Sequence, residues 1–255
     1  AVVSTQSTWA FNRLSQFVAV YIDDVLVFSK STEEHIKHLK QVAEVFREEG
    51  MILSERKIIW MQPKIEFLGL RIQGSREKLQ PHIAEKLQTF PDEFTDRKQI
   101  QVFLGILSYA RAYIRDLAKI SVPIQKKVSS KVPWDWTEKD SEVIRILKQK
   151  AQNLPELEYP DGSEDQLILE TDASDSAWGC ILKISKNHND SISRYWSGCF
   201  NKAEKNYPVH ERELLAVLKG IRANELFLGK PFTIRTDSSY IKNFMRIKLK
   251  RFTQA

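Results

Sequence analysis

Cysteine is scarce in this chain of 255 residues, which contains only Cys180 and Cys199. Both lie in apolar, strand-like runs, and this setting predicts buried free thiols in a reducing compartment rather than disulfides or a metal site. No run of about eighteen apolar residues and no charged-then-apolar leader is present. We therefore expect an intracellular chain that is neither secreted nor inserted into a membrane.

Internal repeats and low-complexity tracts are also absent, and the composition is that of a folded protein. Hydrophobic residues make up 42% and aromatic residues 10% of the chain, which is enough to build cores. The length suits one large domain or two ordinary ones. A formal net charge of +6 and a pI near 9.2 give a mild bias towards polyanionic partners.

Two adjacent aspartates, Asp23 and Asp24, lie between two apolar, β-branched runs in the stretch 17–28, FVAVYIDDVLVF. This pattern predicts a strand, a two-residue turn and a strand, with both carboxylates at the tip of a buried hairpin. Two unshielded like charges there are costly unless a cation binds them, and a divalent metal is the usual partner. The alternative is an ordinary acidic turn, although such turns prefer Asp-Gly or Asn-Gly.

Hydrophobic periodicity and turn residues divide the next part of the chain into strands and helices. A helix is predicted at 31–49, with Gly50 as its terminator. Short strands are predicted at 57–60 and 65–72. Helical spacing then dominates 81–128 and returns at 138–154.

The carboxyl-terminal part changes to an α/β pattern. Strands are predicted at 166–171, 179–184, 194–200 and 232–235, and helices at 208–228 and 240–245. Three strands in a meander, followed by helix, strand and helix, predict a mixed sheet with helices packed on it.

A second set of acids occurs in this part. Asp172 and Asp237 each stand where an apolar strand ends, and Glu211 lies in the first turn of the amphipathic helix. Strand ends are common ligand sites, and three converging acids would repel one another unless Mg²⁺ or Mn²⁺ neutralises them. Two such ions about 4 Å apart can activate a water and stabilise the leaving oxygen of a phosphodiester. The alternative is that the acids cap strand ends and a helix.

These motifs carry a family resemblance. Tyr21-Ile22-Asp23-Asp24 resembles the palm hairpin of reverse transcriptases, and SKSTEEHIKHL (29–39), FLG (67–69) and LGILSY (104–109) resemble the palm and thumb of Gypsy-type LTR retrotransposons and plant pararetroviruses. TDAS (171–174), NYPVHERELLAV (206–217) and RTD (235–237) resemble the ribonuclease H domain that follows in those polyproteins. SGCF (197–200) before Ala203-Glu204, and Arg235 before Thr236-Asp237, favour the caulimovirus family.

The resemblance implies an α+β and α/β fold with four parts. These are a partial reverse-transcriptase palm at 1–75, a helical thumb at 76–128, a connection at 129–162 and a ribonuclease H-like mixed sheet with helices at 163–255. The implied function is that of a fragment of an RNA-directed DNA polymerase with ribonuclease H. We expect it in the cytoplasm, in a virus-like particle or in the nucleus.

The resemblance also assigns roles to individual residues. Asp23 would be a metal ligand for nucleotide addition and Asp24 its acidic neighbour. Asp172, Glu211 and Asp237 would hold the metals that cut RNA paired to DNA, with two Mg²⁺ or Mn²⁺ ions in each active site. The implied partners are an RNA–DNA hybrid and template–primer, deoxynucleoside triphosphates in the full-length enzyme, and the remainder of a polyprotein.

Six further residues are expected to contact nucleic acid. Phe67, Leu68 and Gly69 would lie in the hairpin that grips the primer. Lys126, Lys127 and Lys131 would contact phosphates, although any single lysine can equally be a solvated surface residue.

The sequence departs from the family at both ends. Reverse transcriptases need another metal-binding aspartate on a strand upstream of the hairpin, and residues 1–16 do not resemble what usually precedes the hairpin. Ribonuclease H domains of this kind carry a fourth carboxylate on a later helix, which is not reached before Ala255. We therefore expect a weakly held second metal and low cleavage activity or none.

Three other interpretations are open. A catalytically inactive remnant could still grip nucleic acid, which salt-dependent hybrid binding without cleavage would support. An integrase or transposase requires the order Asp, Asp, Glu, whereas the order here is Asp, Glu, Asp. His35 and His38 share one helical face, but no cysteine pair is nearby, and we interpret them as surface histidines rather than zinc ligands.

We predict that this chain alone does not polymerise DNA, because the hairpin supplies only part of a polymerase metal site. Primed template incubated with the chain, deoxynucleoside triphosphates and Mg²⁺ should remain unextended. Mg²⁺-dependent incorporation in this primer-extension assay would contradict the prediction.

Overall fold

The structure is a computed structural model that describes residues 10–162, 165–187 and 189–243. The chain divides into two compact units, an amino-terminal unit of residues 1–67 and a carboxyl-terminal unit of residues 68–255. Among the described residues, no helix has the length and apolar character needed to cross a membrane.

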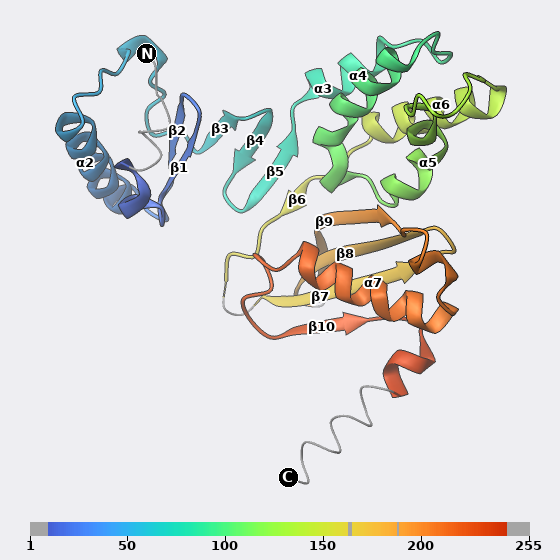
Figure 1. Cartoon of the computed structure of the whole chain (residues 1–255). Coiled ribbons are helices and arrows are strands. Elements are labelled where there is room, and N and C mark those ends of the chain that lie inside the picture. The colour runs from blue at the N-terminus through green and yellow to red at the C-terminus, as the bar shows by residue number, and fades with distance from the viewer. Residues whose placement is uncertain (1–9, 163–164, 188, 244–255) are drawn as a thin grey trace. The chain divides into compact units, whose positions relative to one another are not determined.

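The amino-terminal unit consists of a hairpin and a helix that packs against it (Figure 1). Strands β1 (Val18–Tyr21) and β2 (Asp24–Val27) pair antiparallel, and helix α2 spans Thr32–Glu48. Short 3-10 turns η1 (Asn12–Leu14) and η2 (Glu55–Lys57) and strand β3 (Lys64–Phe67) complete the unit. Its core is formed by the buried side chains of Phe11, Leu14, Val18, Val42, Val45 and Phe46.

Helix α2 confirms the helix predicted at 31–49. Ser31 is its N-cap, and the Ser31 Oγ accepts a hydrogen bond from the Glu34 N–H at 3.2 Å. Gly50 follows its end with a φ of +62°, a conformation that glycine adopts without strain. The strand predicted at 57–60 is wrong, because Lys57 ends η2 and residues 58–60 have no regular structure. Apolar residues there satisfied the pattern, but no strand pairs with them among the described residues.

The tip of the β1–β2 hairpin differs from the prediction. Tyr21 pairs with Asp24, so the two turn residues are Ile22 and Asp23, and Asp24 is the first residue of β2. The tip is exposed rather than buried, with Ile22 67% exposed. Ile22 has a φ of +52°, a left-handed conformation that strains a β-branched residue.

The first part of the carboxyl-terminal unit is a small antiparallel sheet with four helices. Strand β4 (Leu70–Gln73) pairs with β5 (Arg76–Leu79), which pairs with β6 (Leu157–Glu158). The single strand predicted at 65–72 is interrupted at Leu68 and Gly69, whose φ values are +50° and +79°. Strand β5 was not predicted, because the alternation in Arg-Glu-Lys-Leu contains one apolar residue.

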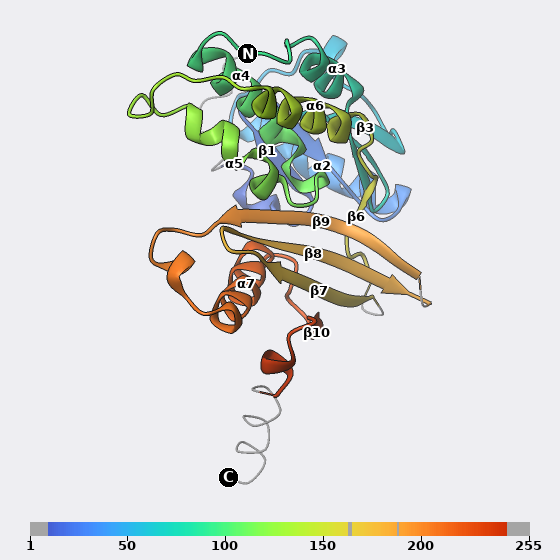
Figure 2. The same cartoon turned by 90° about the vertical axis from the view of Figure 1, so that its right-hand side faces the viewer.

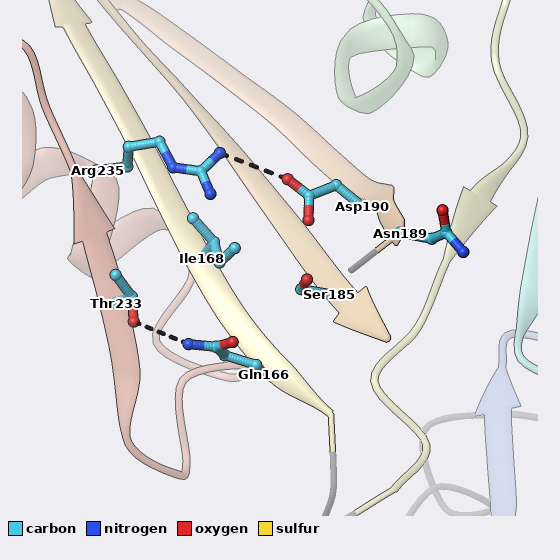
Figure 3. Close-up of a pocket in the computed structure, with 7 residues that line it drawn as sticks. All are labelled: Gln166, Ile168, Ser185, Asn189, Asp190, Thr233 and Arg235. Atoms are coloured by element: carbon cyan, nitrogen blue, oxygen red, sulfur yellow. Dashed lines mark hydrogen bonds and ion pairs between the residues drawn. The ribbon is translucent and has the colours of Figure 1, made fainter. Parts of the chain in front are cut away.

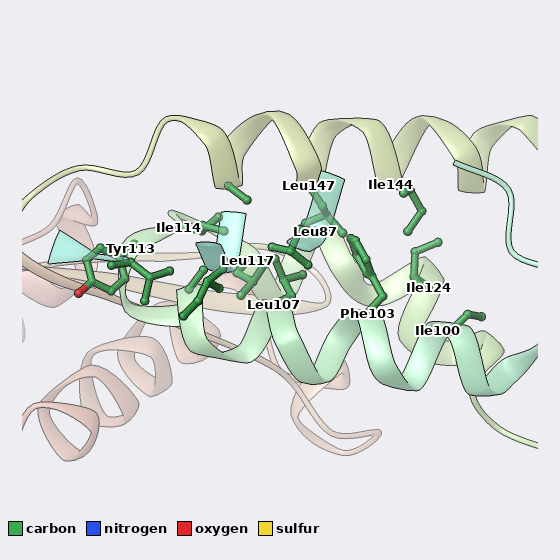
Figure 4. Close-up of a cluster of buried hydrophobic side chains, with 14 of the residues drawn as sticks. Leu87, Ile100, Phe103, Leu107, Tyr113, Ile114, Leu117, Ile124, Ile144 and Leu147 are labelled. Carbon is green, nitrogen blue, oxygen red and sulfur yellow. The ribbon is translucent and has the colours of Figure 1, made fainter. Parts of the chain in front are cut away.

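The helical predictions for this part are confirmed. The helices are α3 (Pro81–Gln88), α4 (Arg97–Leu107), α5 (Leu117–Lys127) and α6 (Glu138–Gln152), with the 3-10 segment η3 (Ser108–Tyr113) between α4 and α5. Figure 4 shows their shared core, in which Leu87, Ile100, Phe103, Ile124, Ile144 and Leu147 are fully buried. Leu79 of β5 and Leu157 of β6 belong to the same core, so the small sheet and the helices fold together.

The second part is the C-terminal sheet, formed by β7 (Gln166–Ala173), β8 (Ala177–Lys186), β9 (Asn189–Cys199) and β10 (Phe232–Arg235). The strand order is β10-β7-β8-β9, with β10 parallel to β7 and the other neighbours antiparallel. This confirms the predicted mixed sheet. The short turn η4 (Glu204–Asn206) leads into helix α7 (Val209–Ala223), which covers one face (Figures 1 and 2).

Helix α7 packs closely on the sheet through a glycine. A Cβ on Gly220 would come within 3.2 Å of both Cys180 Cβ and Thr171 Cγ2, so a larger residue would push the helix away. The helix ends earlier than the predicted residue 228, because the Asn224 Nδ2 donates to the Gly220 carbonyl at 2.8 Å and caps it. Residues 239–243 are helical; residues 244 and 245 of the predicted 240–245 helix lie outside the described residues.

A buried polar cluster joins the small sheet to the C-terminal sheet. The carboxylate of Glu77, which is 4% exposed, accepts a hydrogen bond from the Tyr159 hydroxyl. The Arg194 guanidinium of β9 lies over the ring of Phe227 at 3.8 Å and the ring of Tyr159 at 5.5 Å. Burial, and then the Glu77 carboxylate, raise the pKa of Tyr159 to about 12.

We predict that replacing Ile22 with Asn stabilises the hairpin by about 1 kcal/mol, because asparagine tolerates the left-handed conformation and little burial is lost. Hydrogen exchange of the Ala19 and Leu26 amides, which belong to a hydrogen-bonded pair of the hairpin, should slow about fivefold. Ile36→Asn is the matched control, since Ile36 is 44% exposed but helical. Amide exchange in Ile22→Asn that is as fast as in the wild type, or faster, would show that the left-handed conformation of Ile22 does not destabilise the hairpin.

The Tyr159 cluster predicts an alkaline loss of stability. A raised pKa means that the folded state favours the neutral phenol, so this contribution is complete below pH 10 and is lost as the pH rises towards 12. Tyr159→Phe should lower the free energy of unfolding at pH 7 by about 1–3 kcal/mol and flatten the alkaline decline. Urea unfolding at pH 7 and 10.5 measures both effects, with the exposed Tyr109→Phe as control. Equal alkaline slopes for the wild type and Tyr159→Phe would refute this account.

Candidate functional site

Asp172 and Asp237 lie at the same edge of the C-terminal sheet. In the parallel pair of β10 and β7, Arg235 is opposite Glu170, and each aspartate follows two residues later. Both side chains are exposed, and neither carboxylate makes a hydrogen bond or ion pair within the described part of the chain. The segment after Asp237 is ordered by the Ile241 N–H, which donates to Ser238 Oγ at 3.4 Å.

The first turn of α7 lies at this edge as well. The rings of His210 and Tyr240 have their centres 4.6 Å apart, which connects the helix to the segment after Asp237. The Arg212 Nη1 donates to the Asp175 Oδ1 at 2.8 Å, which connects the helix to the turn after Asp172. The helix start is therefore held between the two segments that carry the aspartates.

The rotation of α7 decides which of its acids faces the sheet. Gly220 contacts the sheet, and Glu213 precedes it by seven residues, which at 100° per residue returns to within about 20° of the same direction. Glu211 precedes Gly220 by nine residues, which places it on the opposite side, and it is exposed. Sequence reasoning missed Glu213, because its spacing of four and seven residues from Val217 and Gly220 points to the sheet only once the Gly220 contact is known.

The described residues contain no group of three His, Cys, Asp or Glu side chains close enough to hold a metal ion. Strand alternation explains why the expected trio does not converge there. Thr171 faces α7, so the next residue, Asp172, faces the other side of the sheet together with Glu170. Two strand-end carboxylates and a helix acid thus approach one edge from different faces. Carboxylate oxygens are the donors that Mg²⁺ and Mn²⁺ prefer, so the chemistry of these side chains suits such an ion.

The face of the sheet opposite α7 carries a polar cavity of about 550 Å³ (Figure 3). Its lining consists of Gln166, Ile168, Ser185, Asn189, Asp190, Thr233 and Arg235. Lys183 Nζ and Arg235 Nη1 contact Glu170 Oε1 at 2.8 and 2.6 Å. Burial acts to raise the pKa of Glu170, but these two cations outweigh it and lower the pKa. Glu170 is therefore kept ionised and paired.

The hairpin of the amino-terminal unit presents Asp23 at its turn and Asp24 at the start of β2. Both are exposed, and no third acid forms a metal-binding group with them among the residues described. The structure thus places the predicted pair next to each other at an accessible tip.

The predicted nucleic-acid contacts differ in their surroundings. Phe67 ends β3, and Leu68 and Gly69 form the left-handed turn that follows. Lys126 and Lys131 are exposed. Lys127 is only 15% exposed, and its Nζ lies 3.0 Å from Asp140 Oδ2. This ion pair neutralises the Lys127 ammonium group, so Lys127 is not available to bind a phosphate in this conformation.

Two family models match the chain. One described as "Reverse transcriptase (RNA-dependent DNA polymerase)" matches residues 3–72, and one described as "RNase H-like domain found in reverse transcriptase" matches residues 136–239. The first match corrects the expectation for residues 1–16, because it begins at residue 3. Phe11 and Leu14 of this segment are buried in the core of the amino-terminal unit.

Curated relatives and solved structures agree with these matches. The enzymatic polyprotein of cauliflower mosaic virus (strain D/H) is 42% identical over 246 residues, which cover 94% of this chain and 36% of the relative. The enzymatic polyprotein of Cestrum yellow leaf curling virus is 44% identical over 251 residues, which cover 93% of this chain and 39% of the relative. The chain spans little more than a third of the length of these relatives. The resemblance predicted from the motifs is therefore confirmed.

The fold class is confirmed by structures of the foamy viral protease-reverse transcriptase. One, designated dRH and in complex with ds DNA, has a TM-score of 0.77 and 21% identity and covers 94% of this chain and 42% of that chain. Another, in complex with an RNA/DNA hybrid, has a TM-score of 0.74 and 22% identity, and the match covers 91% of this chain and 32% of that chain.

Proposed function

We propose that this chain, a viral polyprotein segment with reverse-transcriptase and ribonuclease H-like domains, contributes the edge of a C-terminal sheet at which the RNA strand of an RNA–DNA hybrid is cleaved. The observation that supports this most strongly is the parallel register of β10 and β7, which brings Asp172 and Asp237 to one edge. The two contacts that hold the start of α7 there add an acid-bearing helix to the same place.

The acids at this edge would hold Mg²⁺ or Mn²⁺. Asp172 and Asp237 are the strand ligands, and the helix contributes Glu211, as the sequence predicts, or Glu213, as the rotation of α7 favours. Two bound ions would supply an activated water and neutralise the leaving oxygen of the phosphodiester. The chain itself carries Asp172 on β7, the helix acid on α7 and Asp237 just after β10, and it leaves the carboxylates of both aspartates exposed.

The amino-terminal unit would contribute the tip of a polymerase site in the longer protein. Asp23 would bind the metal used for nucleotide addition, with Asp24 beside it, when template–primer and deoxynucleoside triphosphates are held by the rest of the polyprotein. Phe67, Leu68 and Gly69 would contact the primer, and the exposed Lys126 and Lys131 would contact phosphates.

A second function, nucleic-acid binding without cleavage, is favoured by one observation. No three metal-ligating side chains converge in the part of the chain that the structure describes. A site with two strand acids and a displaced helix acid would bind its second ion weakly, since metal affinity depends on ligand number and geometry.

We predict that Asp172→Asn and Asp237→Asn each reduce cleavage of an RNA–DNA hybrid by at least about 100-fold, because outer-shell changes alone cost 10–100-fold. Glu213→Gln should have the same effect and Glu211→Gln a smaller one. Hybrid cleavage with Mg²⁺ and with Mn²⁺ is the measurement, and the exposed Glu225→Gln is the control.

Each result decides between the candidate functions. A larger loss in Glu211→Gln than in Glu213→Gln would restore the acid predicted from sequence. Salt-dependent binding of the hybrid without cleavage in the wild type would support the binding function. Cleavage that survives in Asp172→Asn and Asp237→Asn would show that this edge is not the active site.

A further inference from the structure

Arg212 is a buried cation at the candidate edge. It is the fourth residue of α7 and only 8% exposed. Its Nη1 contacts Asp175 Oδ1 at 2.8 Å, and its Nε is buried without a hydrogen-bond partner among the described residues. The Asp175 side chain is 95% exposed. In the described part of the chain, this nearly desolvated guanidinium thus has one ion-pair partner, and the Asp175 carboxylate that forms it is exposed to water.

Stability of the fold does not account for this arginine. A guanidinium has five N–H donors, and burying it is costly unless they are satisfied. An ion pair with an exposed carboxylate contributes little, because solvent screens it. The position near the amino terminus of α7 is also unfavourable, since the helix dipole there repels cations. An apolar side chain of similar volume would pack at least as well.

The partner of Arg212 belongs to a well-defined turn. Asp175 lies between β7 and β8, where the Ser174 N–H donates to the Ala177 carbonyl at 2.8 Å and the Ala177 N–H donates to Ser174 Oγ at 3.1 Å. The Phe200 N–H fixes the turn further by donating to the Ser176 carbonyl at 2.9 Å. Asp175 is three residues from Asp172, so a displacement of this turn would also displace the end of β7 that carries Asp172.

The other end of the ion pair is connected to the helix acids. Arg212 lies between Glu211 and Glu213 in the chain and on the same rigid helical turn. The Arg212–Asp175 ion pair therefore joins the acid-bearing turn of α7 to the turn after Asp172. Its length sets how far the helix acid stands from the strand-end acid.

We propose that Arg212 is a positioning residue for metal binding at this edge. Through Asp175 it holds the start of α7 against the β7–β8 turn, so that the helix acid and Asp172 can share a divalent ion although they approach from different faces. Its positive charge also offsets the repulsion among the neighbouring carboxylates while the ion binds. This inference rests on the proposed cleavage function and assigns a role to a residue that contacts neither substrate nor metal.

The experiment uses the full chain with four substitutions. Arg212→Met keeps the volume and removes the charge, Arg212→Lys keeps the charge, and Asp175→Asn removes the partner. Lys219→Met is the matched control, because Lys219 of α7 pairs with Glu204 at 2.9 Å without contacting an edge acid. The readouts are Mn²⁺ binding by calorimetry, kcat and KM for hybrid cleavage, and urea unfolding.

A positioning role predicts a specific pattern. Arg212→Met and Asp175→Asn should weaken Mn²⁺ binding and lower kcat about 10- to 100-fold, with KM for the hybrid within about twofold of the wild type. Arg212→Lys should recover part of the loss, and the double variant Arg212→Met/Asp175→Asn should be no worse than either single variant. Unfolding midpoints of Arg212→Met and Lys219→Met should match that of the wild type.

The contrary outcomes are distinct from failure of the proposed function. Normal Mn²⁺ binding and kcat in Arg212→Met would overturn the positioning role while leaving Asp172 and Asp237 as candidate ligands. A rise in KM at constant kcat would mean that Arg212 contacts substrate. A parallel loss in Lys219→Met, or a lowered unfolding midpoint, would show a general structural effect. Absence of Mn²⁺ binding and cleavage in the wild type would reject both the role and the function.

Discussion

The parallel pairing of β10 with β7 is the interaction on which the candidate site depends. β10 contributes four residues, and their register ends with Arg235 opposite Glu170, two residues before each aspartate. A slip of one residue would move Asp237 by about 3.3 Å along the strand direction and turn its side chain to the other face of the sheet. The close approach of Gly220 to Thr171 and Cys180 keeps α7 on the sheet, which fixes the third contributor to the edge.

The edge combines accessible acids with contacts that hold their supporting elements in place. Asp172 and Asp237 have no partners within the described residues, whereas Glu170, two residues earlier, is paired with Lys183 and Arg235. The same strand therefore carries one neutralised carboxylate and one available carboxylate. His210 and Arg212 hold the helix from two sides, and Asp172 stands on β7, whereas Asp237 lies two residues beyond the end of β10.

Local patterns predicted the regular elements well and the turns poorly. The helices α2 and α6, the Gly50 terminator of α2 and the strand β10 were predicted from the sequence, because each is set by neighbouring residues. The turn at Ile22 was not, since a left-handed β-branched residue is disfavoured locally and requires tertiary support. Glu213 was missed for a related reason: which side of α7 faces the sheet follows from the Gly220 contact, and only the folded structure shows it.

Paramagnetic broadening of backbone amide signals by Mn²⁺ tests most directly whether this edge binds a divalent ion. The account predicts that substoichiometric Mn²⁺ broadens the amides of Asp172, Ala173 and Thr236–Ser238 first, together with the first turn of α7. Asp172→Asn should remove that broadening. Selective broadening elsewhere in the carboxyl-terminal unit, or none at this edge, would contradict the central claim.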